Sequence, residues 1–234
     1  MPRFLARCVL LPSIVAALAA ASVAVAEPPS GSLPGAVRLL ESGRDVTAAE
    51  ARHTVVWLET ATAVESPEPT GQPLQMTTVR KQFLPRVLAA PVGSEVAFPN
   101  QDPILHNVFS VDRANRFDVG LYGSGESEST TFTSEGVVPV FCNVHHDMIG
   151  YVVVLDTPFY AAPGRDGSFR FDGVPPGPAK LTVWHERAKA RTLNVTVPLI
   201  GSLTVDLEIS KPRVPRHRNK FGKPYSRKRR GRAY

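Results

Sequence analysis

The sequence is poor in cysteine, with only Cys8 and Cys142 among 234 residues. Cys8 lies in an apolar stretch near the N-terminus, so a chain that loses this stretch keeps one thiol and cannot form an intramolecular disulfide. A lone thiol is a liability in an oxidising compartment unless burial or a bound metal protects it. Cys142 is therefore either a buried, inert residue or a metal ligand.

No apolar run reaches the roughly 20 residues that a membrane-spanning helix needs. The N-terminus instead has the pattern of a cleavable signal peptide, with Arg3 and Arg7, an apolar stretch over residues 8–21, and Ala24-Val25-Ala26. We expect a signal peptide over residues 1–26, cleaved after Ala26. The mature protein would then be periplasmic or secreted, and an uncleaved anchor is the alternative.

Helical periodicity is scarce, whereas short β-branched or aromatic segments alternate with turn residues, and 22 prolines and 17 glycines are spread along the chain. This pattern is typical of an all-β Greek-key sandwich. We expect one β-sandwich domain over 33–156 and a smaller β-module over 157–210 that packs against it, because about 50 residues bury little core alone. The expected strands are 53–60, 82–90, 95–98, 117–121, 129–133, 137–141, 151–155, 168–171, 180–185, 193–197 and 202–209, with one helical turn in 46–52 and a flexible lead-in over 27–35.

Acidic residues are absent from the last 24 positions. Residues 211–234 hold 11 Lys and Arg, whereas residues 27–210 hold 14 Lys and Arg against 21 Asp and Glu. The chain is thus an acidic body with a basic tail, which we expect to be disordered. The tail, with Arg227-Lys228-Arg229-Arg230, is either a solvated segment or a site for an anionic protein or membrane surface. Because the protein is expected to be exported, we do not expect the tail to bind nucleic acid.

The segment from Phe141 to Met148 carries the most distinctive chemistry. Cys142, His145 and Met148 follow one another at three-residue spacing between two apolar strands. A thiolate, imidazoles and a thioether are the ligands that copper takes in electron-transfer sites, as a trigonal His₂Cys set with a weak axial Met. The second imidazole would come from His106, 36 residues upstream.

Other histidines compete for a role or lack one. His146 directly follows His145, so a Cys-x₃-His reading stands beside the Cys-x₂-His spacing. His53 has no partner in the sequence and is expected to be structural or exposed. His185 is expected to pack beside Trp184, and His217 to be solvated in the tail.

The Cys-x-x-His-x-x-Met loop resembles the short ligand loop of the amicyanin-type blue copper proteins. Together with Phe98–Ser110, Phe117–Tyr122 and Ser124–Ser127, it resembles the plastocyanin-like, "methylamine utilisation protein-like" bacterial cupredoxins. In many of these a carboxypeptidase-regulatory-like (transthyretin-like) β-module follows, which residues 168–209 resemble. The resemblance covers roughly residues 33–209.

This resemblance implies one type 1 copper ion. His106, Cys142 and His145 would be its equatorial ligands and Met148 its axial ligand. Asn107 matches the position that often hydrogen-bonds the ligand thiolate from outside the coordination sphere, where such support orients ligands and tunes the potential.

The sequence therefore favours a blue copper protein that transfers electrons and is not an enzyme, with a redox partner that the sequence does not identify. The alternatives are copper delivery or sequestration, and a structural β-module with a vestigial copper site. The His-x-His pairs that a multicopper oxidase needs are missing. So are a Gly-rich phosphate loop, a nucleophile elbow and an HExxH motif.

Overall fold

The computed structural model describes residues 31–66, 68–69, 71–213 and 217–224. The expected signal peptide over 1–26 and the basic run 227–230 lie outside the described residues. Strands dominate what is described, and its helical segments are α1 (Thr47–Glu50) and the 3₁₀ turn η1 (Ala51–His53), so the all-β prediction is confirmed. No helix in these described ranges is long and apolar enough to span a membrane.

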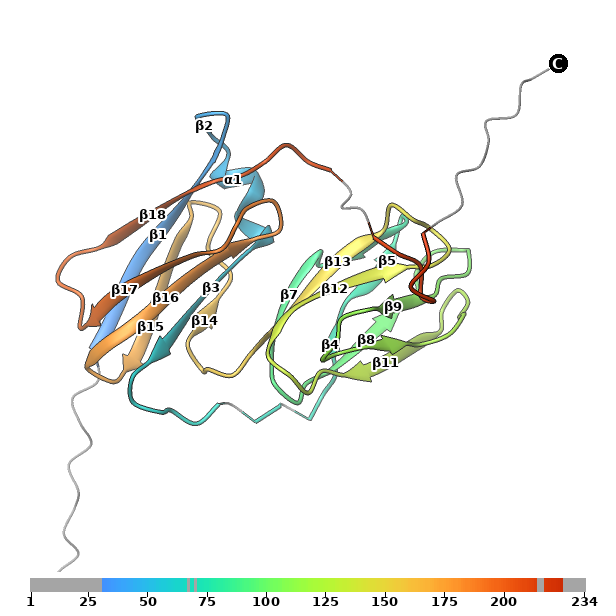
Figure 1. Cartoon of the computed structure of the whole chain (residues 1–234), viewed down its shortest axis with the longest axis horizontal. Coiled ribbons are helices and arrows are strands. Elements are labelled where there is room, and N and C mark those ends of the chain that lie inside the picture. The colour runs from blue at the N-terminus through green and yellow to red at the C-terminus, as the bar shows by residue number, and fades with distance from the viewer. Residues whose placement is uncertain (1–30, 67, 70, 214–216, 225–234) are drawn as a thin grey trace, which may run out of the picture.

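The strands form two β-sandwiches that lie beside each other (Figure 1). We call the first the outer sandwich. One of its sheets has the order β15-β1-β18, with β2 paired to β1, and the other has the order β14-β3-β16-β17. Its strands are β1 (Gly31–Glu41), β2 (Arg44–Asp45), β3 (Thr54–Thr60), β14 (Tyr160–Ala161), β15 (Ser168–Val174), β16 (Gly177–His185), β17 (Arg191–Val197) and β18 (Leu203–Glu208).

We call the second sandwich the inserted sandwich, because its chain runs between β3 and β14 of the outer one. It combines a sheet of order β10-β9-β12-β13-β7 with a sheet of order β11-β8-β4 and the small pair β5-β6. Its strands are β4 (Leu74–Gln75), β5 (Thr77–Val79), β6 (Gln82–Leu84), β7 (Val87–Pro91), β8 (Glu95–Pro99), β9 (Val108–Ser110), β10 (Phe117–Asp118), β11 (Ser127–Thr131), β12 (Gly136–Cys142) and β13 (Ile149–Leu155).

The strand pairing divides the chain differently from the expected boundary near residue 156. β1 pairs with β15 and β18, and β3 pairs with β14 and β16. The N-terminal strands, drawn in blue and dark teal in Figure 1, thus lie among the C-terminal strands in orange and red. The physical reason is burial, since the C-terminal strands alone leave an apolar face in each sheet that Leu33, Leu39, Val56 and Leu58 cover.

Two local expectations also need correction. Residues 31–35, expected within a flexible lead-in, are the first part of the 11-residue strand β1, which is paired on both sides. The expected strand 82–90 is two strands, β6 and β7, separated at Pro85 and Arg86. Pro85 has no amide hydrogen to donate to a strand ladder, which favours the break.

The sandwiches meet through a shared hydrophobic cluster. Trp184 of the outer sandwich packs edge-on to Tyr151 of the inserted one, with ring centroids 5.3 Å apart. Every residue of β13 is buried. Alternate side chains of a strand point to opposite faces, so Val152 and Val154 reach the core of the inserted sandwich while Tyr151 and Val153 reach the interface.

Candidate metal centre

Strand pairing brings the expected ligands together at one end of the inserted sandwich. Cys142 is the last residue of β12, and β12 pairs with β9, where Val108 lies opposite Cys142. His106 lies two positions before β9, so the pairing carries it to the end of β12. His145 and Met148 follow on the short loop between β12 and β13.

The three candidate donor atoms, two imidazole nitrogens and one sulfur, lie close to one another. Cys142 Sγ lies 3.5 Å from His106 Nδ1 and 3.7 Å from His145 Nδ1. The ligand atoms of these residues all lie within 4.8 Å of one another. Cys142 and His106 are fully buried and His145 is half-buried, so the centre is shielded but reaches the surface through one imidazole.

Met148 is buried in the hydrophobic cluster that also contains Cys142. The loop that carries it is closed by its own backbone, because Met148 N donates to His145 O and Cys142 N donates to Met148 O, at 3.0 and 3.3 Å. His146 is exposed on this loop, and the group that could hold a metal contains His145 in its place. The geometry thus agrees with the Cys-x₂-His spacing.

The ring of His106 is oriented by Asp102, an acidic residue that no sequence motif singled out. His106 Nε2 lies 2.9 Å from Asp102 Oδ2. Burial opposes the charged form of Asp102. The backbone N–H groups of Lys81 and Arg80 and the ring of His106 outweigh this and lower the pKa of Asp102. A carboxylate at Nε2 places the ring proton there and leaves the Nδ1 lone pair facing Cys142, as a metal ligand requires.

His145 is in the form that metals bind. Burial lowers the pKa of His145 below its ordinary value, and the neighbouring His106 lowers it further. The imidazole is therefore neutral at pH 7, and Nδ1 is the ring nitrogen that faces the thiol.

Asn107 has different partners from those the resemblance implied. Both hydrogens of its amide are used, since Nδ2 donates to Asp118 Oδ1 at 2.6 Å and to Gly120 O at 2.7 Å. The backbone carbonyl of Asn107 accepts the N–H of Asn143 at 3.0 Å. Asn107 therefore supports the ligand loop through its backbone, and its amide group anchors the adjacent 118–120 turn.

The C-terminal tail also reaches this end of the molecule. We call residues 217–224 the C-terminal clasp. Its His217 ring stacks on Phe141 at 4.2 Å between centroids, Lys220 Nζ lies 2.8 Å from Asp118 Oδ2, and Lys220 N lies 3.5 Å from Asn143 Oδ1. The expectations of disorder for this part of the tail and of a solvated His217 are thus corrected, because the basic segment meets the acidic body beside the ligand loop.

No protein-family profile and no curated protein matches this chain. Several solved structures are similar to part of it. A reduced amicyanin variant is 21% identical over 43% of this chain and 98% of its own, with a TM-score of 0.35. A second reduced amicyanin variant is 23% identical over 42% and 99%, with a TM-score of 0.34. A purple cupredoxin from Nitrosopumilus maritimus is 26% identical over 35% and 99%, with a TM-score of 0.32.

Proposed function

We propose that this protein is an exported type 1 copper protein that transfers electrons. The observation that carries the proposal is the group formed by His106, Cys142 and His145, in which two imidazole nitrogens and one thiol converge. A thiolate with two imidazoles is the donor set that suits a blue copper ion, and Met148 is the buried thioether on the same loop. When bound, copper would supply the one-electron chemistry.

Electron transfer is favoured over substrate chemistry by how firmly these side chains are held. His106 and Cys142 are buried at the ends of paired strands, and Asp102 fixes the orientation of the His106 ring. A ligand set that changes little between oxidation states lowers the cost of gaining and losing an electron.

Three exposed apolar side chains that neighbour the ligands in the sequence or across a strand pair support docking of a redox partner. Leu105 precedes His106, Val144 precedes His145, and both are exposed. Leu121 is also exposed and precedes Tyr122, whose backbone pairs with that of His106. Exposed apolar side chains that gather at one place mark an interaction surface. We propose that the unidentified redox partner docks here, near the half-buried His145.

The location and the role of the tail are part of the proposal. The signal-peptide pattern of residues 1–26 supports a periplasmic or secreted protein. The basic residues of 211–234 support association with an anionic protein or membrane surface, which would weaken as salt rises.

The test is the visible spectrum of the purified mature protein with one equivalent of Cu(II). We expect an intense thiolate-to-copper charge-transfer band that Cys142→Ser abolishes. His146→Ala, which removes an exposed imidazole outside the ligand group, should leave the band intact and serves as the control. A colourless Cu(II) complex together with rapid transfer of Cu(I) to a chelator would contradict electron transfer and favour copper delivery.

A further inference from the structure

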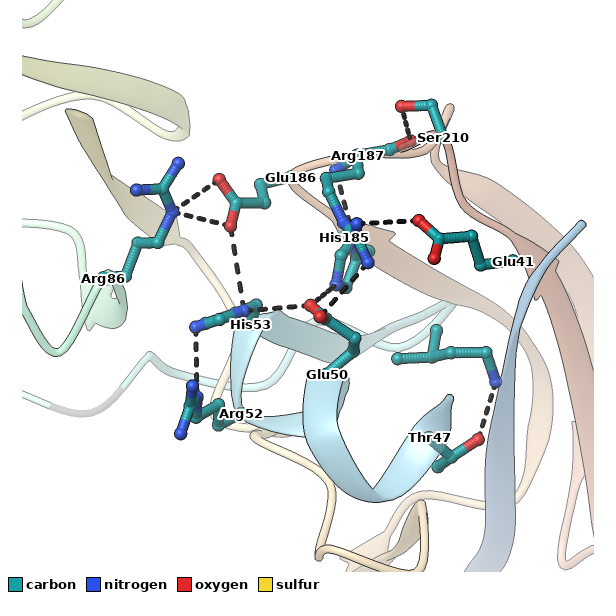
Figure 2. Close-up of polar contacts among 11 residues, drawn as sticks. Glu41, Thr47, Glu50, Arg52, His53, Arg86, His185, Glu186, Arg187 and Ser210 are labelled. Carbon is teal, nitrogen blue, oxygen red and sulfur yellow. Dashed lines mark hydrogen bonds and ion pairs between the residues drawn. The ribbon is translucent and has the colours of Figure 1, made fainter. Parts of the chain in front are cut away.

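A second cluster of histidines lies beside the junction of the two sandwiches, on the outer one. His53, at the end of η1, and His185, the last residue of β16, face each other across Glu50 of α1 (Figure 2). The ligating atoms of these three residues all lie within 4.8 Å of one another. No local sequence pattern indicates this cluster, because 132 positions separate the two histidines.

One carboxylate oxygen faces both rings. Glu50 Oε2 lies 3.2 Å from His53 Nδ1 and 3.6 Å from His185 Nε2. The other oxygen, Oε1, lies 3.2 Å from a guanidinium nitrogen of Arg187, whose second nitrogen pairs with Glu41 at 3.1 Å. Arg187 therefore fixes the orientation of Glu50 so that Oε2 points at the two imidazoles.

His185 supplies an independent sign of a missing partner. Its side chain is 0% exposed, and its Nε2, which points into the cluster, has no hydrogen-bond partner among the described residues. A buried polar atom left without a partner costs free energy, and native structures seldom keep one without a reason. Burial lowers the pKa of His185 to about 4, against the opposing effect of Glu50 and Glu186, so the ring is neutral at pH 7.

We propose that Glu50, His53 and His185 form a second metal site, which takes a divalent transition-metal ion with Zn²⁺ as its simplest occupant. Two imidazoles and one carboxylate are a common three-residue ligand set for such ions and leave a further coordination position open. Glu186 Oε1, 3.7 Å from His53 Nδ1, is the nearest additional carboxylate oxygen. This set lacks a thiolate and so differs in kind from the copper centre.

The site has an entry path. It borders a cavity of about 880 Å³ that residues of both sandwiches line, including Arg86 and Tyr151 from the inserted one. Arg86 Nε donates to both carboxylate oxygens of Glu186, at 2.7 and 2.8 Å. This ion pair joins the two sandwiches and forms part of the cavity wall. An ion at this site would therefore tie its ligands together beside that contact.

The positions of the protons on the two imidazole rings show which hydrogen bonds must change when a metal ion binds. Arg187 N–H donates to His185 Nδ1 at 3.1 Å, and Arg52 Nε donates to His53 Nε2 at 3.2 Å. In the metal-free form, both rings therefore carry a proton on the nitrogen that faces Glu50. Ligation moves each proton to the other ring nitrogen with no net release. The exposed Arg52 side chain can turn away, whereas the Arg187 amide, in the turn after β16, must give up its acceptor.

The experiment is a calorimetric titration of the full mature chain with Zn²⁺ at neutral pH. The Cys142→Ser/His145→Ala background removes two ligands of the copper centre, so the outcome does not depend on the proposed function. We expect one equivalent of Zn²⁺ to bind. Adding Glu50→Gln or His53→Ala should lower the affinity at least tenfold, whereas the matched control His146→Ala should not change it. Absence of binding in the background, or equal affinity in the Glu50→Gln protein, would overturn the proposal.

Substituting the buried His185 could disturb folding. A second measurement therefore tests His185 as a ligand in a protein that keeps this residue. In a ¹H–¹⁵N spectrum, Zn²⁺ should shift the Arg187 amide resonance, since this N–H loses the His185 Nδ1 acceptor. The shift should be absent in the His53→Ala protein at the same Zn²⁺ concentration. Binding of Zn²⁺ that leaves the Arg187 amide unmoved would exclude His185 as a ligand and overturn the proposed set.

Discussion

The two histidine clusters hold their buried imidazoles in opposite ways. At the proposed copper centre, Nε2 of His106 faces the Asp102 carboxylate and the other ring nitrogen faces Cys142. At the junction, His185 accepts a backbone N–H on Nδ1 and turns a protonated Nε2 toward Glu50. A hydrogen-bond acceptor at the outer ring nitrogen holds the ring proton there, so the inner nitrogen has a free lone pair for a metal. A donor at the outer nitrogen leaves the proton on the inner one. We therefore expect copper to enter the first site without rearrangement, and an ion at the second to bind more weakly.

The largest expected effect concerns His185 and the pH. Its pKa is lowered to about 4 by burial, whereas an unfolded histidine titrates near 6.5. Between these values the unfolded state binds the extra proton, so the free energy of unfolding should fall as the pH falls from about 6.5 to about 4. The full shift corresponds to about 3 kcal/mol at most.

Urea unfolding of the metal-free protein across this pH range measures the slope. In the His185→Gln protein the slope should flatten, whatever that substitution does to stability at pH 7. His53, Glu50, Glu186 and Arg187 surround the ring in both proteins, so the difference between the two slopes isolates His185. Equal slopes would show that His185 does not stay neutral in the folded state.

A somewhat smaller effect is expected at the proposed copper centre for Asp102→Ala. Removing the carboxylate frees Nε2 of His106 and allows the ring proton to move to the nitrogen that faces Cys142. Loss of such a supporting group commonly lowers metal affinity about 10- to 100-fold. Competition with a Cu(II) chelator measures this. The matched control is Asp112→Ala, an aspartate of the same sandwich outside the ligand group, and equal affinities for the two variants would contradict the role of Asp102.

The sequence indicates the proposed copper ligands more directly than the domain boundary. Cys142, His145 and Met148 share one short loop, so their spacing alone indicates the chemistry. Strand β1, by contrast, pairs with β15 and β18, more than 130 residues away, and no local pattern reports such a partner. The first part of β1 was expected to be a flexible lead-in, so the sequence indicated neither this strand nor the sheet to which it belongs.

The roles of Asp102, Glu50 and His185 were not predicted, and the distance along the chain explains this for Glu50 and His185. Asp102 lies four positions before His106, on a turn that could direct its carboxylate toward the ring, and this was the available signal. Glu50 and His185 had no such signal, because only the pairing of β3 with β16 brings η1 beside the end of β16. Sequence patterns therefore indicate the three candidate ligands that share one loop, whereas they do not indicate Glu50 and His185, which only long-range strand pairing brings together.

The smallest expected effect concerns the C-terminal clasp. Its contacts fall on Phe141 and Asn143, which flank Cys142, and on Asp118, which accepts from the Asn107 amide. Deleting 211–234 should therefore loosen the ligand loop while keeping all the proposed copper ligands. We expect the charge-transfer band to persist, the Asn143 amide to exchange faster with deuterium, and copper to dissociate a few-fold faster.

Lys220→Ala separates the ion pair from the rest of the clasp. The Lys220–Asp118 pair is partly exposed, and such pairs contribute about 0–1 kcal/mol and weaken in high salt. The variant should reproduce only part of the faster exchange at Asn143, and high salt should remove the difference from wild type. Lys223→Ala, an exposed lysine of the same segment, is the matched control. If the complete deletion left exchange at Asn143 unchanged, the clasp would not restrain the ligand loop, and the firmness of the copper centre would come from Asp102 and the strands alone.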